Sequence, residues 1–327
     1  MISKPIDRVR FDASVLIREH PPQWLNRNKK EVFEISSSSD YPFEGEVVYA
    51  KWTESELPDS VTGHSGFSIC PGVFTYGTCA SPGTVEWHMN FADPCLFVAY
   101  GSSLLAQDEL QVLEHPALGS LRDALSAMRK PPVTVNSCGS PTPVTITGIQ
   151  RRCAFDTQPN PDCDRPEGLY GNAFARASVE DVVAATTPLS PPTFTNILAI
   201  AAPACGFGNY TIAQIRNVVC TAYSGFLAAR IESGILSKAP SKTVIHTGFW
   251  GCGAFGGNRS LMTLLQSLSA DLAGVDIVFH SLDESKAELV EEARDLYVSL
   301  RDSSSSVPKI LDAIAEQGFC WGESDGN

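Results

Sequence analysis

A glycine-dense turn between a short apolar run and a helical pattern constrains this chain more than any other stretch. It lies within Thr243–Gln266, TVIHTGFWGCGAFGGNRSLMTLLQ. Val244 and Ile245 indicate a buried strand, and leucines follow the glycines at helical spacing (Leu261, Leu264, Leu265 and Leu268). Glycine permits positive φ and leaves no Cβ in the way, and a helix N-terminus offers unpaired N–H groups. The stretch therefore predicts a loop that holds an anion such as a diphosphate.

Two other interpretations of these glycines are open. Gly251, Gly253 and Gly256 fit G-x-G-x-x-G, which also marks dinucleotide-binding Rossmann units. Such a unit needs several further strands, and only Val275–His280 follows as an obvious one, which disfavours an NAD-dependent dehydrogenase. No Lys-Ser/Thr pair follows the glycines, so the loop is not a Walker A motif. The plain alternative is a turn that packs a helix on a strand.

Composition excludes several classes of protein. With 327 residues, 43% of them hydrophobic, the chain suits one large domain with additions, or two small domains. There is no long uncharged apolar run, and the first twenty residues carry charges throughout, so we expect neither a membrane span nor a secretory signal. Ten cysteines without a C-x-x-C pair predict reduced thiols, no metal site and an intracellular location, cytoplasmic or nuclear.

A formal net charge of −13 disfavours nucleic acid as a partner, because phosphate contacts require a basic face. A small anionic ligand is not excluded by that charge. Oriented backbone amides bind such a ligand through local dipoles, whatever the sum of charge over the surface.

Strand patterns alternate with helix patterns along most of the chain, which predicts an α/β protein with a mixed sheet. The expected strands, besides the one before the glycines, are Glu46–Trp52, Val85–Asp93, Val144–Ile149, Asn196–Ala202 and Val275–His280. The expected helices, besides the one after the glycines, are a segment with Leu104, Leu105, Leu110 and Leu113, then Val179–Ala185, Tyr210–Ile231, Glu284–Leu300 and Lys309–Gln317.

Four local features accompany these elements. We expect Ser102 or Ser103 to cap the first of the helices, and Thr187–Thr193 to be a proline-rich linker. We expect the acidic tail ESDGN to be frayed. Three histidines on expected strands are predicted to be core residues: His88, His246 and His280.

Acidic residues follow the strand that ends at Asp93. Gln107, Asp108 and Glu109 fall in the opening turns of the next helix. Ligands of open α/β sheets bind beyond the carboxyl ends of strands, so Asp93 and Gly248–Gly257 could line one cleft. A carboxyl group there could protonate the leaving atom of a glycosidic bond and then activate water, with a neighbouring carboxylate raising its pKa. The alternative is that acidic residues in a first helical turn complement the helix dipole.

The same segments resemble a known family. HTGFWGCGAFGGN is similar to the diphosphate-loop signature of poly(ADP-ribose) glycohydrolases, a macrodomain branch, and NFADPCLFVAYGSSLLAQDELQVLEHPAL resembles their catalytic segment. GIQRRC…LYGNAF and VVCTAYSGFL resemble the adenine-side segment and the helix before the phosphate loop. The resemblance implies a three-layer α/β/α macrodomain over residues 46–301, with an N-terminal extension (1–45) and a C-terminal helix and tail (302–327).

The resemblance also implies roles for individual residues. Glu109 stands at the catalytic glutamate, with Asp108 beside it in place of a glutamate that contacts the ribose hydroxyls. Asp93 replaces an asparagine near the same ribose, and Tyr170 or Phe174 would stack on adenine. No metal or cofactor is implied. The complete set of implied ligand-binding residues is Asp93, Gln107, Tyr170, Phe174, Gly251, Gly253, Ala254, Phe255, Gly256 and Gly257.

The chain departs from the family pattern in two places. Phe97-Val98-Ala99 stands where the family has three glycines, and Asp108 shortens one carboxylate by a methylene. These changes resemble a related branch that includes the Legionella effector MavL, whose members remove single ADP-ribose units from arginine. We therefore expect an ADP-ribosyl hydrolase that binds ADP-ribose and acts on mono-ADP-ribosylated protein. The alternatives are hydrolysis of polymer and a non-catalytic reader, which the acidic residues disfavour.

Overall fold

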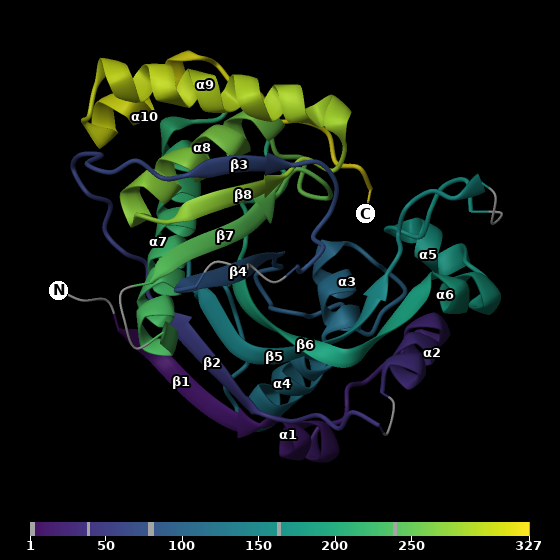
Figure 1. Ribbon diagram of the computed structural model, residues 1–327. Coiled ribbons are helices and arrows are strands. Elements are labelled where there is room, and N and C mark those ends of the chain that lie inside the picture. Colours follow the sequence, from purple (N-terminus) through teal and green to yellow (C-terminus); the bar gives the residue numbers. More distant parts are fainter. Residues whose placement is uncertain (1–3, 38–39, 78–81, 162–164, 238–240, 327) are drawn as a thin grey trace.

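A computed structural model describes residues 4–37, 40–77, 82–161, 165–237 and 241–326. Within these ranges eight strands form one sheet in the order β1-β2-β5-β6-β4-β7-β8-β3 (Figure 1). β1, β2, β5 and β6 pair antiparallel, whereas β6, β4, β7, β8 and β3 run parallel, so the predicted mixed sheet is confirmed. The strands are β1 (Pro5–Asp12), β2 (Glu46–Trp52), β3 (Phe67–Cys70), β4 (Thr84–Phe91), β5 (Val144–Phe155), β6 (Thr186–Ile200), β7 (Lys242–Gly248) and β8 (Asp276–His280).

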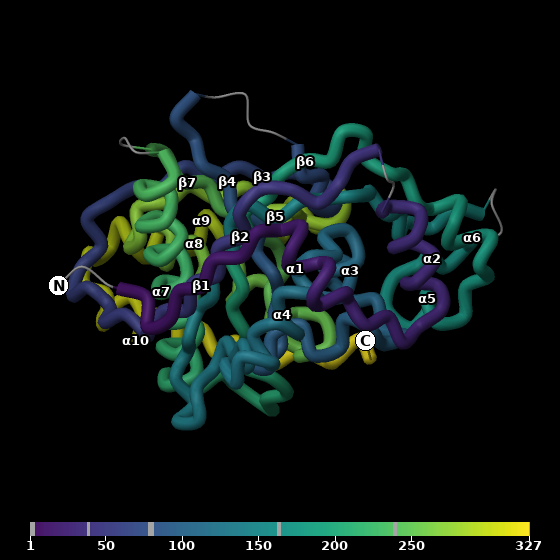
Figure 2. Tube along the Cα trace, turned by 90° about the horizontal axis from the view of Figure 1, so that it is seen from below, coloured from purple at the N-terminus to yellow at the C-terminus, as the bar shows by residue number. Residues whose placement is uncertain are grey.

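Helices cover both faces of the sheet (Figures 1 and 2). In β6, Leu198 and Ile200 pack in the core formed with α7 and α8, whereas Ile197 and Ala199 pack in the core formed with α1 and α4. This alternation confirms the three-layer arrangement. The helices are α1 (Ala13–Glu19), α2 (Arg27–Ser36), α3 (Gln107–Glu114), α4 (Ala117–Ala127), α5 (Asn172–Arg176), α6 (Val179–Ala185), α7 (Ile212–Ser237), α8 (Arg259–Ala273), the 3₁₀ turn η2 (Glu284–Lys286), α9 (Ala287–Ser303) and α10 (Val307–Glu316).

The strand–glycine loop–helix unit forms as predicted, from β7 to α8. The loop ends where the Asn258 side chain accepts a hydrogen bond from Leu261 N at 3.0 Å and so caps α8. The helix stops at Gly274, whose φ of 65° suits a residue without Cβ. Sequence-local signals therefore define both ends of this helix.

The prediction of a linker at Thr187–Thr193 is wrong, because these residues belong to β6 and pair with β5. Proline lacks the N–H that a central strand needs. β4 pairs with β6 only from Ile197 onward, so among the described strands the proline-containing half of β6 has a partner on one side. β5 is correspondingly longer than the predicted Val144–Ile149.

The predicted serine cap of α3 is also wrong. The helix begins at Gln107 with Ala106 as its N-cap, and Ser102 Oγ accepts instead from Leu104 N at 3.2 Å. Ala106 has no side chain that can cap the helix. Its own N–H donates to the Glu109 carboxylate at 3.0 Å, which is one half of a capping box. The helix ends at Glu114, with His115 as its C-cap.

The first 45 residues contribute one strand to the sheet and two helices that pack against later parts of the chain. β1 pairs with β2 along its length, and α1 contacts α4. α2 lies beside α5 and α6 in both views (Figures 1 and 2). The boundaries proposed at residues 45 and 301 remain predictions, but this segment is packed against the rest of the chain.

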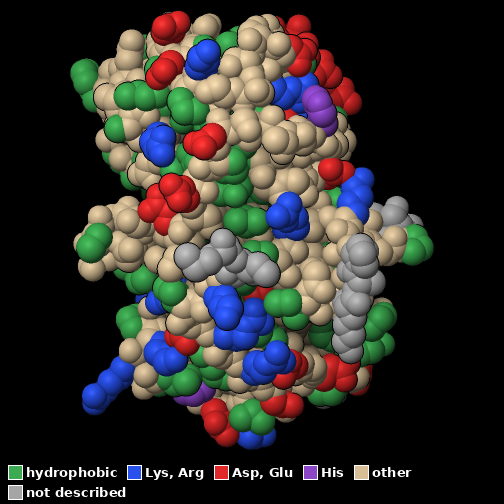
Figure 3. Space-filling view, turned by 90° about the vertical axis from the view of Figure 1, so that its left-hand side faces the viewer, with side chains coloured by type: hydrophobic (Ala, Val, Ile, Leu, Met, Phe, Trp, Pro, Cys, Tyr) green, Lys and Arg blue, Asp and Glu red, His purple; other side chains and the backbone are tan. Residues whose placement is uncertain are grey.

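No helix in the described part of the chain is both long and apolar enough to cross a membrane. On the face shown in Figure 3, Lys and Arg side chains lie among Asp and Glu side chains. That mixture does not offer the single basic surface that a nucleic acid backbone would require.

Candidate active site

A cavity of about 880 Å³ lies beyond the carboxyl ends of the parallel strands. Residues that follow four of these strands line it, namely Ala92 and Asp93 after β4, Ala202 after β6, Phe249 after β7 and Leu282 after β8. The start of α3, residues 73–76, residues 154–159, Glu167 and Tyr170 also line it. The size suits a nucleotide-sized ligand, and the position is the one where open α/β sheets bind ligands.

The two motifs singled out in the sequence meet in this cavity, since Glu109 and Phe255 both line it. The predicted site residues that line it are Asp93, Gln107, Asp108, Glu109, Tyr170, Gly251, Gly253, Ala254 and Phe255. Gly256 and Gly257 do not, and their N–H groups donate within the loop to Gly253 O and Gly251 O.

Of the two aromatic residues considered for stacking on adenine, Tyr170 lines the cavity and Phe174 does not. Phe174 is fully buried in a core cluster, where its ring contacts Phe155 edge-on at 5.7 Å between centroids. Tyr170 retains 40% of its exposure. A ligand in the cavity can therefore reach Tyr170.

Contacts with the rest of the chain hold the glycine loop in shape. Gly251 has a φ of 74°, and a Cβ there would lie 2.5 Å from the Ala202 Cβ, so the position requires glycine. The Trp250 indole donates to Ile200 O at 3.1 Å and ties the loop to β6. Cys205 N donates to Phe255 O at 3.1 Å on the other side. These contacts on both sides of the loop hold the backbone of Gly253–Phe255 at the cavity.

Side chains at the start of α3 connect it to β4. The Gln107 amide accepts from Phe91 N at 2.7 Å and donates to Met89 O at 2.9 Å, so it fastens the helix to the strand end. Asn90 Nδ2 donates to Asp108 Oδ1 at 3.1 Å. The Glu109 carboxylate accepts a hydrogen bond from Ala106 N and also lines the cavity, so the same side chain can cap the helix and contact a ligand.

Burial shapes the acidity of this pair. Asp108 is 8% exposed and Glu109 4%. Burial raises the pKa of Asp108, and the neighbouring Glu109 charge raises it further, while the hydrogen bond from Asn90 opposes the rise. Burial also raises the pKa of Glu109, with the charge of Lys29 as the main opposing influence. Because both pKa values are raised, these carboxyls retain a proton to higher pH than free carboxyls do, as a general acid must.

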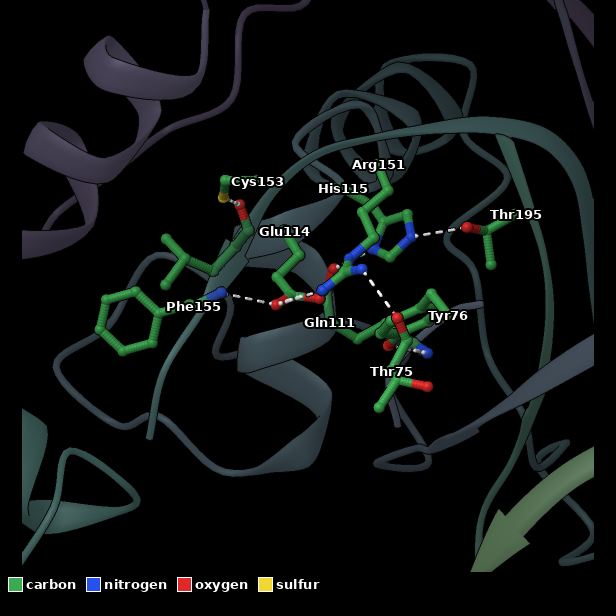
Figure 4. A network of polar contacts seen from close by, with 10 residues as sticks. Thr75, Tyr76, Gln111, Glu114, His115, Arg151, Cys153, Phe155 and Thr195 are labelled. Atoms are coloured by element: carbon green, nitrogen blue, oxygen red, sulfur yellow. Dashed lines mark hydrogen bonds and ion pairs between the residues drawn. The ribbon is translucent and has the colours of Figure 1, made fainter. Parts of the chain in front are cut away.

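A second charged pair stands at the other end of α3 (Figure 4). Arg151 of β5 donates from Nε and Nη2 to the Glu114 carboxylate at 2.9 and 3.1 Å, and from Nη1 to Thr75 O at 3.1 Å. Glu114 also accepts from Phe155 N at 2.8 Å, and the guanidinium lies 4.4 Å from the Tyr76 ring centroid. Sequence reasoning missed this pair; the available signal was Glu114 in the run QVLEH and the two arginines in the run GIQRRC.

Two of the three strand histidines are buried as predicted: His88 and His280 are each 4% exposed, whereas His246 is only partly buried and His280 also lines the cavity. His88 stacks on His246 with 4.3 Å between ring centroids, and His246 Nδ1 lies 3.1 Å from His280 Nε2. Burial lowers the pKa of His88 well below its usual range and that of His280 to about 4, so both are neutral at neutral pH. In the described part of the chain, no group of His, Cys, Asp or Glu has the arrangement of a metal site.

The acidic tail, expected to fray, lies along the glycine loop. Trp321 stacks on Tyr210 at 4.1 Å between ring centroids. Beyond it Gly322 N donates to Gly256 O at 2.8 Å, and Asn172 Nδ2 donates to Gly326 O at 2.9 Å. Asp325 consequently lines the cavity. Stacking between two aromatic residues that are far apart in the sequence holds this segment in place. The polar composition of the tail gives no sign of that contact.

The sequence also matches the model of a known family. A family model described as "Poly (ADP-ribose) glycohydrolase (PARG), Macro domain fold" matches residues 169–289. The matched segment contains Tyr170 and the whole glycine loop, and it ends before most of α9. The match supports the resemblance to these glycohydrolases over that segment, whereas α3 lies outside it.

Solved structures of two bacterial enzymes are also similar. Poly(ADP-ribose) glycohydrolase from Thermomonospora curvata is 13% identical with a TM-score of 0.44, over 89% of this chain and 85% of that one. The enzyme from Deinococcus radiodurans in complex with ADP-ribose is 12% identical with a TM-score of 0.41, over 89% of this chain and 94% of that one. Both similarities are weak.

Proposed function

We propose that this protein is an ADP-ribosyl hydrolase that releases single ADP-ribose units from arginine side chains of modified proteins. The observation that carries the proposal is the shared cavity, in which the glycine loop after β7 faces the acidic start of α3. The family match over the glycine loop supports ADP-ribose as the ligand. Backbone amides at Gly253–Phe255 would hold the diphosphate, and Tyr170 would stack on adenine.

The acidic pair supplies the chemistry. A protonated Glu109 gives its proton to the leaving nitrogen as the bond from that atom to the ribose anomeric carbon breaks. The resulting carboxylate takes a proton from the water that attacks the oxocarbenium-like sugar, which restores the starting state and yields free ADP-ribose. Burial, and to a smaller degree the charge of Asp93, raises the pKa of Glu109. Asp108 and Asp93 would hold the ribose hydroxyls.

The residues before α3 favour a single ADP-ribose over a polymer. Phe97 is buried with a φ of 56°, a conformation that residues with a Cβ adopt rarely. Val98 and Ala99 line the cavity, so their side chains occupy space where the resemblance places bare glycine backbone. A narrower cavity at this point has less room for a continuing chain.

A panel of defined substrates tests the proposal. Peptides carrying ADP-ribose on arginine, serine or glutamate, and poly(ADP-ribose), would be incubated with the full chain, with free ADP-ribose as the readout. We expect fastest release from arginine. Fastest release from polymer would support the glycohydrolase alternative. Calorimetric binding of ADP-ribose with no release from any substrate would support the non-catalytic reader.

Asp325→Asn is expected to tighten ADP-ribose binding about two- to fivefold at low salt, because the exposed carboxylate lies against the loop that would hold a diphosphate. Glu323→Gln is the matched control, since it removes the same charge from a residue that does not line the cavity. Isothermal titration at low and high salt measures both variants. Weaker binding by Asp325→Asn would show that the carboxylate contacts the ligand favourably.

A further inference from the structure

A buried lysine from the N-terminal segment reaches the loop in front of α3. Lys29 lies on α2 and has no exposed surface. Its Nζ donates to Tyr100 O at 2.8 Å and to Leu104 O at 2.6 Å. These two carbonyls bracket the short loop that leads from Tyr100 to the first turn of the helix carrying Asp108 and Glu109.

Neighbouring backbone contacts fix the same loop to the N-terminal segment. Leu25 N and Asn26 N both donate to Gly101 O at 3.0 Å, and Gln23 N donates to the Tyr100 hydroxyl at 2.7 Å. A Cβ on Gly101 would lie 2.2 Å from Gln23 O, so the two backbones are in direct contact. The conformation of this loop therefore depends on residues 23–29.

The surroundings of Lys29 compensate part of the cost of burying its charge. An ammonium group is costly to bury unless carbonyls and opposite charges compensate. Burial lowers the pKa of Lys29 to about 8, while the charges of Glu109 and Asp108 oppose that fall. The side chain is therefore still mainly protonated at pH 7, and its positive charge lowers the pKa of both acidic residues.

We propose that Lys29 is a positioning residue of the active site, which fixes the loop that starts α3 and supplies the positive charge that balances Asp108 and Glu109. The proposal rests on the proposed function, because it assigns the pair its catalytic role. It also gives the N-terminal segment a part in the reaction. Lys29 contacts no substrate and acts only through the loop and through its charge.

The charge of Lys29 affects the pH dependence of the reaction rate in a direction that can be derived. The charged groups that shift the pKa of Glu109 come from two other elements, Lys29 on α2 and Asp93 after β4. The charge of Glu109 in turn raises the pKa of Asp108 beside it and that of Tyr170 before α5. Lys29 lowers the pKa of Glu109, whereas Asp93 raises it. Removing the lysine charge must therefore raise the pKa of the pair, and the limb of the pH–rate profile that reports the pair must move to higher pH.

Lys29→Met and Lys30→Met form a matched test. Lys30 is the next residue, exposed and 3.8 Å from Glu34 in a surface ion pair. In Lys29→Met we expect the limb of kcat/KM assigned to the pair to rise by about one pH unit, and in Lys30→Met no shift. A fall in activity by the same factor at every pH in Lys29→Met would assign the lysine a purely structural role and overturn the proposal.

A second measurement covers the case in which Lys29→Met does not fold. The pKa of the buried lysine can be followed by ¹³C NMR of lysine side chains in the wild type and in Glu109→Gln. Because the Glu109 charge raises the pKa of Lys29, we expect a lower value in the variant; an unchanged value would contradict the coupling. This readout needs no turnover. Failure to release ADP-ribose from any substrate would refute the proposed function and leave the coupling measurable.

Discussion

Glu109→Gln is expected to lower kcat for ADP-ribose release by about 10²- to 10⁴-fold, while ADP-ribose still binds. An amide can neither give nor take the proton that bond cleavage and water attack require. The change is otherwise conservative, because a glutamine oxygen can accept from Ala106 N as Glu109 does. Single-turnover kinetics on the preferred substrate and titration of ADP-ribose measure the two effects separately.

Glu109→Ala is the control for the capping contact. It removes the acceptor as well as the proton, so we expect it to lower stability by about 1 kcal/mol, whereas Glu109→Gln leaves the melting temperature nearly unchanged. If Glu109→Gln retained most of the activity, Glu109 would be a helix cap alone. The acidic start of α3 would then only complement the helix dipole.

Local sequence signals predicted the elements that build the glycine loop. Val244 and Ile245, the glycines and the leucine spacing each determine backbone conformation within a few residues, and β7, the loop and α8 follow from them. The cap of α3 failed for a physical reason. Ser102 and Ser103 are good caps, but the helix starts at Gln107, where Glu109 supplies the acceptor from inside the first turn.

Pairings between distant residues could not be predicted. Thr187–Thr193 is a strand because β5 supplies a partner on one edge, and its prolines alone suggest a linker. Trp321 stacks on Tyr210, which places the tail at the cavity. A periodic pattern records which face of an element is apolar, but not what covers it. The hydrogen bonds from Lys29 to Tyr100 O and Leu104 O could not be predicted for the same reason.

The joining of both motifs in one cavity has a topological explanation. β4 and β7 are neighbours and parallel, so the residues that follow them emerge at the same edge of the sheet. Asp93 and the glycine loop therefore lie at the same edge, although they are far apart in the sequence. α3 is added to that edge by Gln107, which bonds to the last residues of β4. The order of strands, more than the distance along the chain, determines which sequence motifs share the site.

Glu114→Gln is expected to lower the free energy of unfolding by about 3 to 5 kcal/mol, because it leaves the buried Arg151 guanidinium without a compensating charge. Burial raises the pKa of Glu114 although Arg151 opposes it, and the same carboxylate raises the pKa of Arg151. The first shift favours a neutral Glu114, and the second favours a charged pair. Two hydrogen bonds from one guanidinium to one carboxylate are typical of an ion pair, so both groups are charged. Urea unfolding followed by circular dichroism measures the change.

The surface pair between Lys30 and Glu34 provides the matched control. Both side chains are mostly exposed and 3.8 Å apart, so we expect Glu34→Gln to change stability by less than about 1 kcal/mol. The double variant Glu114→Leu/Arg151→Met removes both buried charges and should be more stable than Glu114→Gln alone. A loss below about 1 kcal/mol in Glu114→Gln would mean that the other partners of Arg151, Thr75 O and the Tyr76 ring, suffice to hold its charge.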